Sequence, residues 1–310
     1  MLDLAIIGGG PAGLSAGMYA TRGGIKNVVL YEKGLLGGQI TSSSEIENYP
    51  GQLKVKSGMD FMYDWPEQST QFGLKTETKE VKNLKKIDDY FELTFDDSTK
   101  VEAKTVIIGT GNVPRSANIK GEKSFFGRGV SICATCDGFF YKNKDVVIVG
   151  GGNTAVEEAI YLSNICNKVT LIHRGQLRAT PNIIEVMKSK NNIEAILDTN
   201  IDEIVGDQTG VTGVKYTTKE KDQESLDVLG VFIFVGREID HSVIEDENGN
   251  LICEVNRNDE IIVSHKMKTS LENLWAVGDM RSEASRQVVC AAADGATAAL
   301  DIVAYFNSQK

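Results

Sequence analysis

The chain has 310 residues, of which 41% are hydrophobic and 25% charged, a composition that excludes a disordered chain, a collagen and a coiled coil. Its 33 basic and 43 acidic side chains give a formal net charge of −10, which argues against non-specific nucleic-acid binding. No uninterrupted run of about 18 apolar residues occurs, and residues 1–4 carry no basic side chain, so we expect neither a membrane span nor a signal peptide. The five cysteines include only one close pair, so we expect a cytoplasmic protein of about two domains rather than a disulfide scaffold.

The first predicted unit is a strand, a glycine turn, a helix and a second strand. The apolar run 4–7 predicts the first strand, a helix-like pattern begins at Leu14, and the run 28–31 predicts a strand that ends at Glu32. The turn reads Gly8-Gly9-Gly10-Pro11-Ala12-Gly13. A G-x-G-x-x-G turn at this place lets a pyrophosphate approach the N–H groups of a helix N-terminus; the alternative is a tight turn without a ligand. Because Glu32 can hydrogen-bond a ribose hydroxyl, this site favours an unphosphorylated adenosine such as that of FAD.

Two further strands are predicted before the next motif. Residues 91–95 alternate apolar and polar side chains, which predicts an exposed strand. Residues 105–108 are continuously apolar and run into Gly109-Thr110-Gly111, which predicts a buried strand followed by a turn.

The most specific motif is Cys133-Ala134-Thr135-Cys136-Asp137. Two thiols separated by two residues can close a disulfide, and one thiolate of such a pair is usually activated. Half of a zinc site is the alternative, but the other three cysteines and the three histidines are scattered, so we expect no metal site. Asp137 can deliver or accept a proton as a thiolate forms and leaves, the alternative being a solvated carboxylate at a helix start.

The strand–turn–helix–strand unit recurs after the cysteine motif. Strands are predicted over 146–149 and 169–172, with a helix over 156–162 and a turn that carries Gly150, Gly152 and Ala155. Where the first copy has Glu32, the second has Arg174, with His173 before it and Arg178 four residues on. A guanidinium pairs with a 2′-phosphate that a carboxylate would repel, so the second site favours NADPH; three solvent-exposed basic groups are the alternative.

The last predicted elements are strands over 231–235 and 274–277 and an alanine-rich helix over 288–306. Hinge segments are expected near 112–115 and 237–244. The expected fold class is α/β, with two Rossmann-like, three-layer ββα dinucleotide-binding domains, the second inserted into the first. The FAD-binding domain would comprise 1–112 and 245–310, and the NADPH-binding domain with the dithiol would comprise 113–244.

These motifs resemble those of the bacterial low-molecular-weight thioredoxin reductases, over essentially the whole chain. Cys133-Ala134-Thr135-Cys136-Asp137-Gly138-Phe139-Phe140 is similar to the redox motif of that family, and residues 8–13 are similar to its FAD turn. Residues 37–39 and 45–51 resemble its flavin-lining segments, and Gly278-Asp279 with Arg286-Gln287-Val288 resembles its second FAD segment. The larger glutathione-reductase-like relatives are disfavoured, because they carry C-x-x-x-x-C in the FAD domain and no cysteine precedes Cys133 here.

The resemblance implies an NADPH-dependent FAD enzyme that reduces the disulfide of thioredoxin and forms a homodimer. Cys136 would face the flavin, Cys133 would attack the thioredoxin disulfide, and Asp137 would be the general acid. The FAD-binding residues expected on this basis are Gly8, Gly10, Pro11, Ala12, Gly13, Glu32, Lys33, Gly37, Gly38, Gln39, Asn48, Asp279, Arg286, Gln287 and Val288. The NADPH-binding residues expected are Gly150, Gly152, Asn153, Thr154, Ala155, His173, Arg174 and Arg178.

One departure and three alternatives qualify this interpretation. The run from His173 to Arg178 is one residue shorter and one arginine poorer than is usual in the family, which predicts a narrower preference for NADPH. The first alternative is an FAD-dependent dithiol oxidase that passes electrons to oxygen, and the second is a reductase of another small redox protein. The third is a non-catalytic flavin redox sensor, for which a two-cysteine shuttle would be superfluous.

Overall fold

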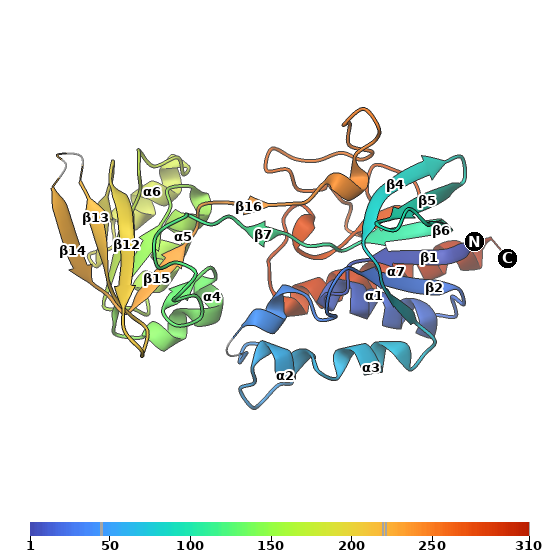
Figure 1. Ribbon diagram of the computed structural model, residues 1–310, viewed down its shortest axis with the longest axis horizontal. Helices are drawn as coiled ribbons and strands as arrows, with labels where there is room; N and C mark the ends of the chain where they lie inside the picture. Colours follow the sequence, from blue (N-terminus) through green and yellow to red (C-terminus); the bar gives the residue numbers. More distant parts are fainter. Residues whose placement is uncertain (44–45, 219, 221, 310) are drawn as a thin grey trace. The chain divides into compact units, whose positions relative to one another are not determined.

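The computed structural model describes residues 1–43, 46–218, 220 and 222–309 and divides the chain into two compact units (Figure 1). Unit 1 comprises Met1–Val113 and Glu238–Lys310, and unit 2 comprises Pro114–Arg237. The chain passes between the units through the short strands β7 (Val113–Pro114) and β16 (Arg237–Glu238), which pair with each other.

Unit 1 is built on a seven-stranded sheet in the order β3-β2-β1-β6-β5-β4, with β17 paired to β6. Its parallel strands are β1 (Leu2–Ile7), β2 (Val28–Glu32), β3 (Lys75–Thr78), β6 (Lys100–Ile108) and β17 (Leu274–Ala276). The antiparallel strands β4 (Val81–Ile87) and β5 (Tyr90–Phe95) extend the sheet beyond β6. Strand β1 is apolar throughout its buried part because it faces two cores: Leu4 and Ile6 pack on the helix side, Ala5 and Ile7 on the opposite side.

The prediction of an exposed strand over 91–95 needs correction. Strand β5 alternates as expected, but it lies between β4 and β6, and the side chains of Phe91, Leu93 and Phe95 are at most 2% exposed. The alternation therefore reflects one buried face, whereas Tyr90, Glu92 and Thr94 lie on the partly exposed face.

The helices of unit 1 centre on α1 (Pro11–Arg22) and α7 (Val288–Ser308), with α2 (Gly58–Met62), α3 (Trp65–Thr70) and the 3-10 turns η1 (Gln39–Ser42), η3 (Ser242–Ile244) and η4 (Gly278–Met280). A Cβ on Gly295 of α7 would overlap the carbonyl oxygen of Ala12, so glycine at this position lets the two helices touch. Among the described residues, α7 is the one helix long and apolar enough to cross a membrane by length and composition. One face of this helix packs in the core of the unit, where Ala298, Ala299 and Ile302 are fully buried.

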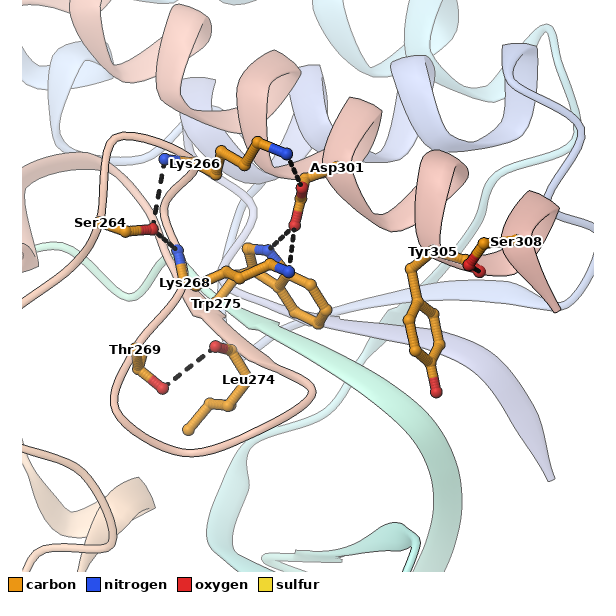
Figure 2. A network of polar contacts seen from close by, with 9 residues as sticks. All are labelled: Ser264, Lys266, Lys268, Thr269, Leu274, Trp275, Asp301, Tyr305 and Ser308. Atoms are coloured by element: carbon orange, nitrogen blue, oxygen red, sulfur yellow. Dashed lines mark hydrogen bonds and ion pairs between the residues drawn. The ribbon is translucent and has the colours of Figure 1, made fainter.

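Buried Asp301 ties α7 to the segment that leads into β17 (Figure 2). Its carboxylate accepts hydrogen bonds at 3.1 Å from the Nζ atoms of Lys266 and Lys268 and at 3.2 Å from Nε1 of Trp275. Burial alone would raise the pKa of this carboxyl, but these three donors outweigh it and hold the pKa below its usual 3.8.

Asp301→Asn should destabilise the fold by about 2 kcal/mol at pH 7, the scale of hydrogen bonds to a charged group. Because the folded-state pKa of Asp301 is lowered, this stabilisation is present above the unfolded pKa and is lost as the pH falls through the folded value, below 3.8. Urea unfolding at pH 7 and pH 3 measures the effect. Glu247→Gln, at an 81% exposed carboxylate paired with Lys85, should leave the stability unchanged at both pH values, because water screens this ion pair. A difference between wild type and Asp301→Asn that is the same at both pH values would contradict this account.

Unit 2 repeats the architecture of unit 1. Its parallel sheet has the order β11-β10-β9-β15-β8 and consists of β8 (Val130–Ser131), β9 (Asp145–Val149), β10 (Lys168–Ile172), β11 (Ile193–Ile196) and β15 (Gly230–Ile233). A separate antiparallel sheet is formed by β12 (Asn200–Gly206), β13 (Val211–Thr217) and β14 (Gln223–Asp227). The helices are α4 (Ala134–Asp137), α5 (Asn153–Ser163) and α6 (Pro181–Lys188), with the 3-10 turn η2 (Gly138–Tyr141).

The central strand of unit 2 is also buried on both faces. Val146 and Ile148 of β9 belong to the core beneath the helices, whereas Val147 belongs to the core beneath the antiparallel sheet. Each unit thus combines a parallel sheet, helices and antiparallel strands, which continue the same sheet in unit 1 and form a separate sheet in unit 2. This confirms the predicted α/β, Rossmann-like fold class.

Candidate active site

The first glycine turn joins β1 to α1 and leaves room at the helix N-terminus. Gly8 has a φ of +107°, and a Cβ there would overlap the carbonyl oxygen of Gly109. A Cβ on Gly13 would overlap the carbonyl oxygen of Gly8, so these two glycines are required for packing. Gly10 differs, because the nearest described atom to a Cβ there would be the Gly38 Cα at 3.7 Å. No described side chain caps α1, and its first turn carries no acidic residue, so its N–H groups are suited to an anion.

Glu32, at the end of β2, is held against the first turn. One carboxylate oxygen accepts the Gly9 N–H at 2.7 Å, and the other accepts the Gly34 N–H at 2.9 Å. Each oxygen keeps a further lone pair, so the carboxylate can still accept from a ribose hydroxyl. Lys33, the next residue, is exposed.

The predicted flavin-lining segments meet the first turn only in part. The Gly37 N–H donates to the Gly9 carbonyl oxygen at 2.8 Å, and a Cβ on Gly38 would lie 2.9 Å from the Gly10 Cα. Gln39 follows as an exposed residue of η1. Of the segment 45–51, Glu45 lies outside the described residues, and exposed Asn48 donates from Nδ2 to Gln287 Oε1 at 3.2 Å.

The Gly278-Asp279 segment reaches the same turn from the far end of the sequence. Gly278 has a φ of +73°, and a Cβ there would lie 3.2 Å from the Ala12 Cβ of α1. Asn112 Nδ2 donates to the Asp279 carbonyl oxygen at 2.6 Å. The buried Asp294 carboxylate accepts the Gly278 N–H at 3.1 Å.

Two ion pairs that no sequence motif indicates hold the segment that leads into α7. Arg281 donates to both oxygens of Asp294, at 2.7 and 2.9 Å, a bidentate pair. Nη2 of Arg286 donates to buried Glu260 at 3.1 Å. The Nε atom of Arg286 is buried and has no hydrogen-bond partner among the described residues, which suits a bound acceptor beside Gln287 and Val288.

The second glycine turn joins β9 to α5 in the same way as the first. Gly150 has a φ of +149°, and a Cβ there would lie 2.9 Å from the Ala155 Cβ. No described atom lies within 4 Å of the place that a Cβ on Gly152 would take, so a ligand can approach the backbone closely at this residue. Asn153 uses its Oδ1 to accept the Thr180 N–H at 2.9 Å, and Thr154 is exposed at the helix start.

The basic run after β10 lies beside this second turn. The Arg178 N–H donates to the Gly151 carbonyl oxygen at 2.7 Å, and a Cβ on Gly151 would overlap the His173 ring. Burial lowers the pKa of His173, and Arg178 and Arg174 lower it further, so the ring is neutral at pH 7. The side chains of Arg174 and Arg178 are exposed and available to an anion.

Cys133 and Cys136 form a disulfide around α4, with their Cα atoms 5.3 Å apart. Both cysteines are partly exposed, whereas burial raises the pKa of the Cys166 thiol to about 11. Asp137, at the end of α4, accepts a hydrogen bond from Ser131 Oγ at 2.6 Å. Among the described residues, no group of three or more His, Cys, Asp or Glu side chains could hold a metal ion.

Comparisons with known proteins agree on the family. The family model described as pyridine nucleotide-disulphide oxidoreductase matches residues 2–295. The thioredoxin reductase of Helicobacter pylori strain J99 is 52% identical over 99% of both chains. The crystal structure of thioredoxin reductase from Streptococcus pyogenes has a TM-score of 0.91 and 36% identity, over 99% of both chains. The glucosaminate ammonia-lyase of Pseudomonas fluorescens is 37% identical over 97% of this chain and 95% of its own length. The full-length matches and the disulfide show that this chain belongs to the pyridine nucleotide-disulphide oxidoreductase family, in agreement with the resemblance in its motifs.

Proposed function

We propose that this chain is a thioredoxin reductase that uses NADPH, FAD and the Cys133–Cys136 disulfide. The observation that carries the proposal is that disulfide, partly exposed and followed directly by Asp137. The 52% identity to a thioredoxin reductase supports the same reaction. The 37% identity to an ammonia-lyase shows that the family alone does not determine the substrate.

Unit 1 is proposed to hold FAD, and unit 2 to hold NADPH and the dithiol. Space at Gly10, the uncapped N-terminus of α1 and the buried Nε of Arg286 fit a flavin dinucleotide. Space at Gly152 and the exposed guanidinium groups of Arg174 and Arg178 fit NADPH. When bound, FAD would take a hydride from NADPH and supply two electrons to the disulfide.

The reduced cysteines then transfer these electrons to the protein substrate. The Cys133 thiolate attacks one sulfur of the thioredoxin disulfide, and the departing thioredoxin thiolate takes a proton from Asp137. Cys136 gives its thiol proton back to Asp137 and attacks the Cys133 sulfur of the mixed disulfide, which restores the Cys133–Cys136 bond. The second thioredoxin sulfur leaves as a thiolate and takes from solvent the proton that Cys133 had released. Thioredoxin gains two electrons and two protons, and the dithiol is oxidised.

NADPH oxidation by the FAD-loaded protein tests this function. We expect oxidation to depend on oxidised thioredoxin and to be accompanied by an equal number of thioredoxin dithiols. Oxygen consumption from dithiols without NADPH would favour the dithiol oxidase, and deamination of glucosaminate would favour the reaction named for the ammonia-lyase relative. Activity only with a different small redox protein would keep the chemistry and change the partner.

Two further parts of the proposal are a cytoplasmic location and a homodimer. Fractionation of cells addresses the first. Light scattering of the FAD-loaded protein addresses the second, and a monomeric mass would exclude the homodimer.

Arg174→Ala should lower kcat/KM for NADPH about tenfold or more and leave that for NADH within about twofold. A hydrogen bond to a charged group contributes roughly 1.5–3 kcal/mol, and 1.4 kcal/mol corresponds to about tenfold. Gln176 is held by a 2.9 Å bond to Asp198, and Arg178 supplies the remaining guanidinium, so NADPH should keep some advantage. Initial rates with both coenzymes measure the effect, and Lys190→Ala, at a partly exposed lysine of the same unit, serves as the control. An equal fall in kcat/KM for both coenzymes would show that Arg174 does not bind the 2′-phosphate.

A further inference from the structure

Ser131 is a buried polar residue that the proposed mechanism does not use. It is the last residue of β8, only 3% exposed, and its backbone is held by parallel pairing with Phe232 of β15. A serine has one rotatable side-chain bond to its hydroxyl, so a buried backbone position fixes the place of the oxygen closely.

Three contacts connect this hydroxyl to the dithiol segment. Oγ donates to Asp137 Oδ2 at 2.6 Å, a length typical of a hydroxyl bound to a carboxylate. Oγ accepts the Cys133 N–H at 3.1 Å, and it also lies 3.2 Å from the Cys133 carbonyl oxygen. One oxygen therefore touches both the residue that begins the cysteine turn and the carboxylate that follows it.

Helix α4 cannot hold Asp137 in place by itself. It has four residues, fewer than an isolated helix needs to be stable. When the disulfide opens, the covalent link between Cys133 and Cys136 is lost as well. Oxidation or reduction of the two sulfurs leaves the Ser131 hydroxyl, the Cys133 amide and the Asp137 carboxyl group chemically unchanged, so these groups remain able to form the same hydrogen bonds when the disulfide opens.

We propose that Ser131 is a positioning residue of the dithiol centre, which holds the Asp137 carboxyl where it delivers a proton to the leaving thiolate. The inference rests on the proposed function, since it assigns Asp137 the role of general acid. Ser131 itself exchanges no proton with substrate.

The test uses two small disulfides that differ in their need for an acid. The holoenzyme is reduced with dithiothreitol, freed of it, and mixed with either 2-hydroxyethyl disulfide or 5,5′-dithiobis(2-nitrobenzoic acid). In each reaction the dithiol becomes a disulfide and the probe becomes two thiols. Alkyl thiolates leave poorly and require protonation, whereas the aromatic thiolate leaves without it. Ser131→Ala should therefore slow the alkyl disulfide about tenfold and the aromatic disulfide less than about twofold.

A merely structural role would slow both probes alike, and that result would overturn the proposal. Ser131→Thr retains a hydroxyl and should react with the alkyl disulfide at about the wild-type rate. Ser131→Val has the shape of the threonine variant but no hydroxyl, and it should react as slowly as Ser131→Ala. The Thr and Val variants replace Ser131→Ala if that variant folds poorly. In an Asp137→Asn background, Ser131→Ala should lower the rate with the alkyl disulfide by less than about a further twofold, because Ser131 acts through the carboxyl group of Asp137.

Ser163→Ala is the matched control. It removes another buried hydroxyl of the same unit, one that donates at 2.7 Å to the Ile160 carbonyl oxygen of its own helix. Both probe rates should stay at the wild-type value. The reactions with the small disulfides need neither NADPH nor thioredoxin. If the wild type fails to reduce thioredoxin, the proposed function is refuted. The slower reaction of Ser131→Ala with the alkyl disulfide can still be measured in that case.

Discussion

Cys136→Ser and Cys133→Ser should each abolish NADPH-dependent thioredoxin reduction, with a fall in kcat/KM of about 10³-fold or more. The two thiols act as one unit, so removal of either interrupts the reaction as completely as removal of both. Steady-state NADPH oxidation with oxidised thioredoxin measures the loss. Cys166→Ala is the matched control, because its buried thiol, whose pKa is raised to about 11, should take no part in turnover.

The two cysteine variants should also differ from each other. In Cys136→Ser, reduced Cys133 can still attack thioredoxin, but no second thiol resolves the product, so a covalent mixed disulfide should accumulate. Cys133→Ser should give no such adduct. Mass spectrometry of protein quenched with acid distinguishes the two variants, and adducts on Cys136 in Cys133→Ser would reverse the assigned roles.

Asp137→Asn should lower kcat about 10²-fold, at the lower end of the usual contribution of a general acid. Asparagine keeps the size of the side chain and can still accept the Ser131 hydrogen bond, but it has no carboxyl proton to give. The dependence of kcat on pH should also lose the limb that reports the essential acid. Turnover with thioredoxin between pH 5 and pH 9 measures both effects.

Glu194→Gln provides the control for Asp137→Asn. This carboxylate lies in β11 of the same unit, is 54% exposed and pairs with Lys168. Its removal should leave kcat and its pH dependence unchanged. A fall of less than about threefold in Asp137→Asn would mean that solvent supplies the proton.

Interactions local in the chain were predictable from the sequence. The glycine turns could be predicted because they depend on local backbone conformation. Gly8 and Gly150 adopt positive φ, and Gly13 packs closely against Gly8. The Cys133–Cys136 pair is readable because a three-residue separation already brings the sulfurs within reach. Strands such as β1 and β9 are readable because burial on both faces demands a continuous apolar run.

Contacts that cross the fold were not predictable. Strand β8 has two residues, too few to show any periodicity, so the sequence does not indicate that Ser131 contacts Asp137. The contact depends on the pairing of β8 with β15. The Asn48–Gln287 bond joins residues 239 apart. A buried carboxylate such as Asp294 reads as an ordinary polar residue until its partner is known.

By itself, the sequence determined the two glycine turns, the cysteine pair and the α/β class, because each depends on backbone conformation or on hydrophobic burial within one element. Only the tertiary structure decided which side chains support them, because sheet pairing and helix packing bring distant residues together. Glu260 and Asp294 are buried charges, and a buried charge is tolerated only where the fold supplies its partner, here Arg286 and Arg281.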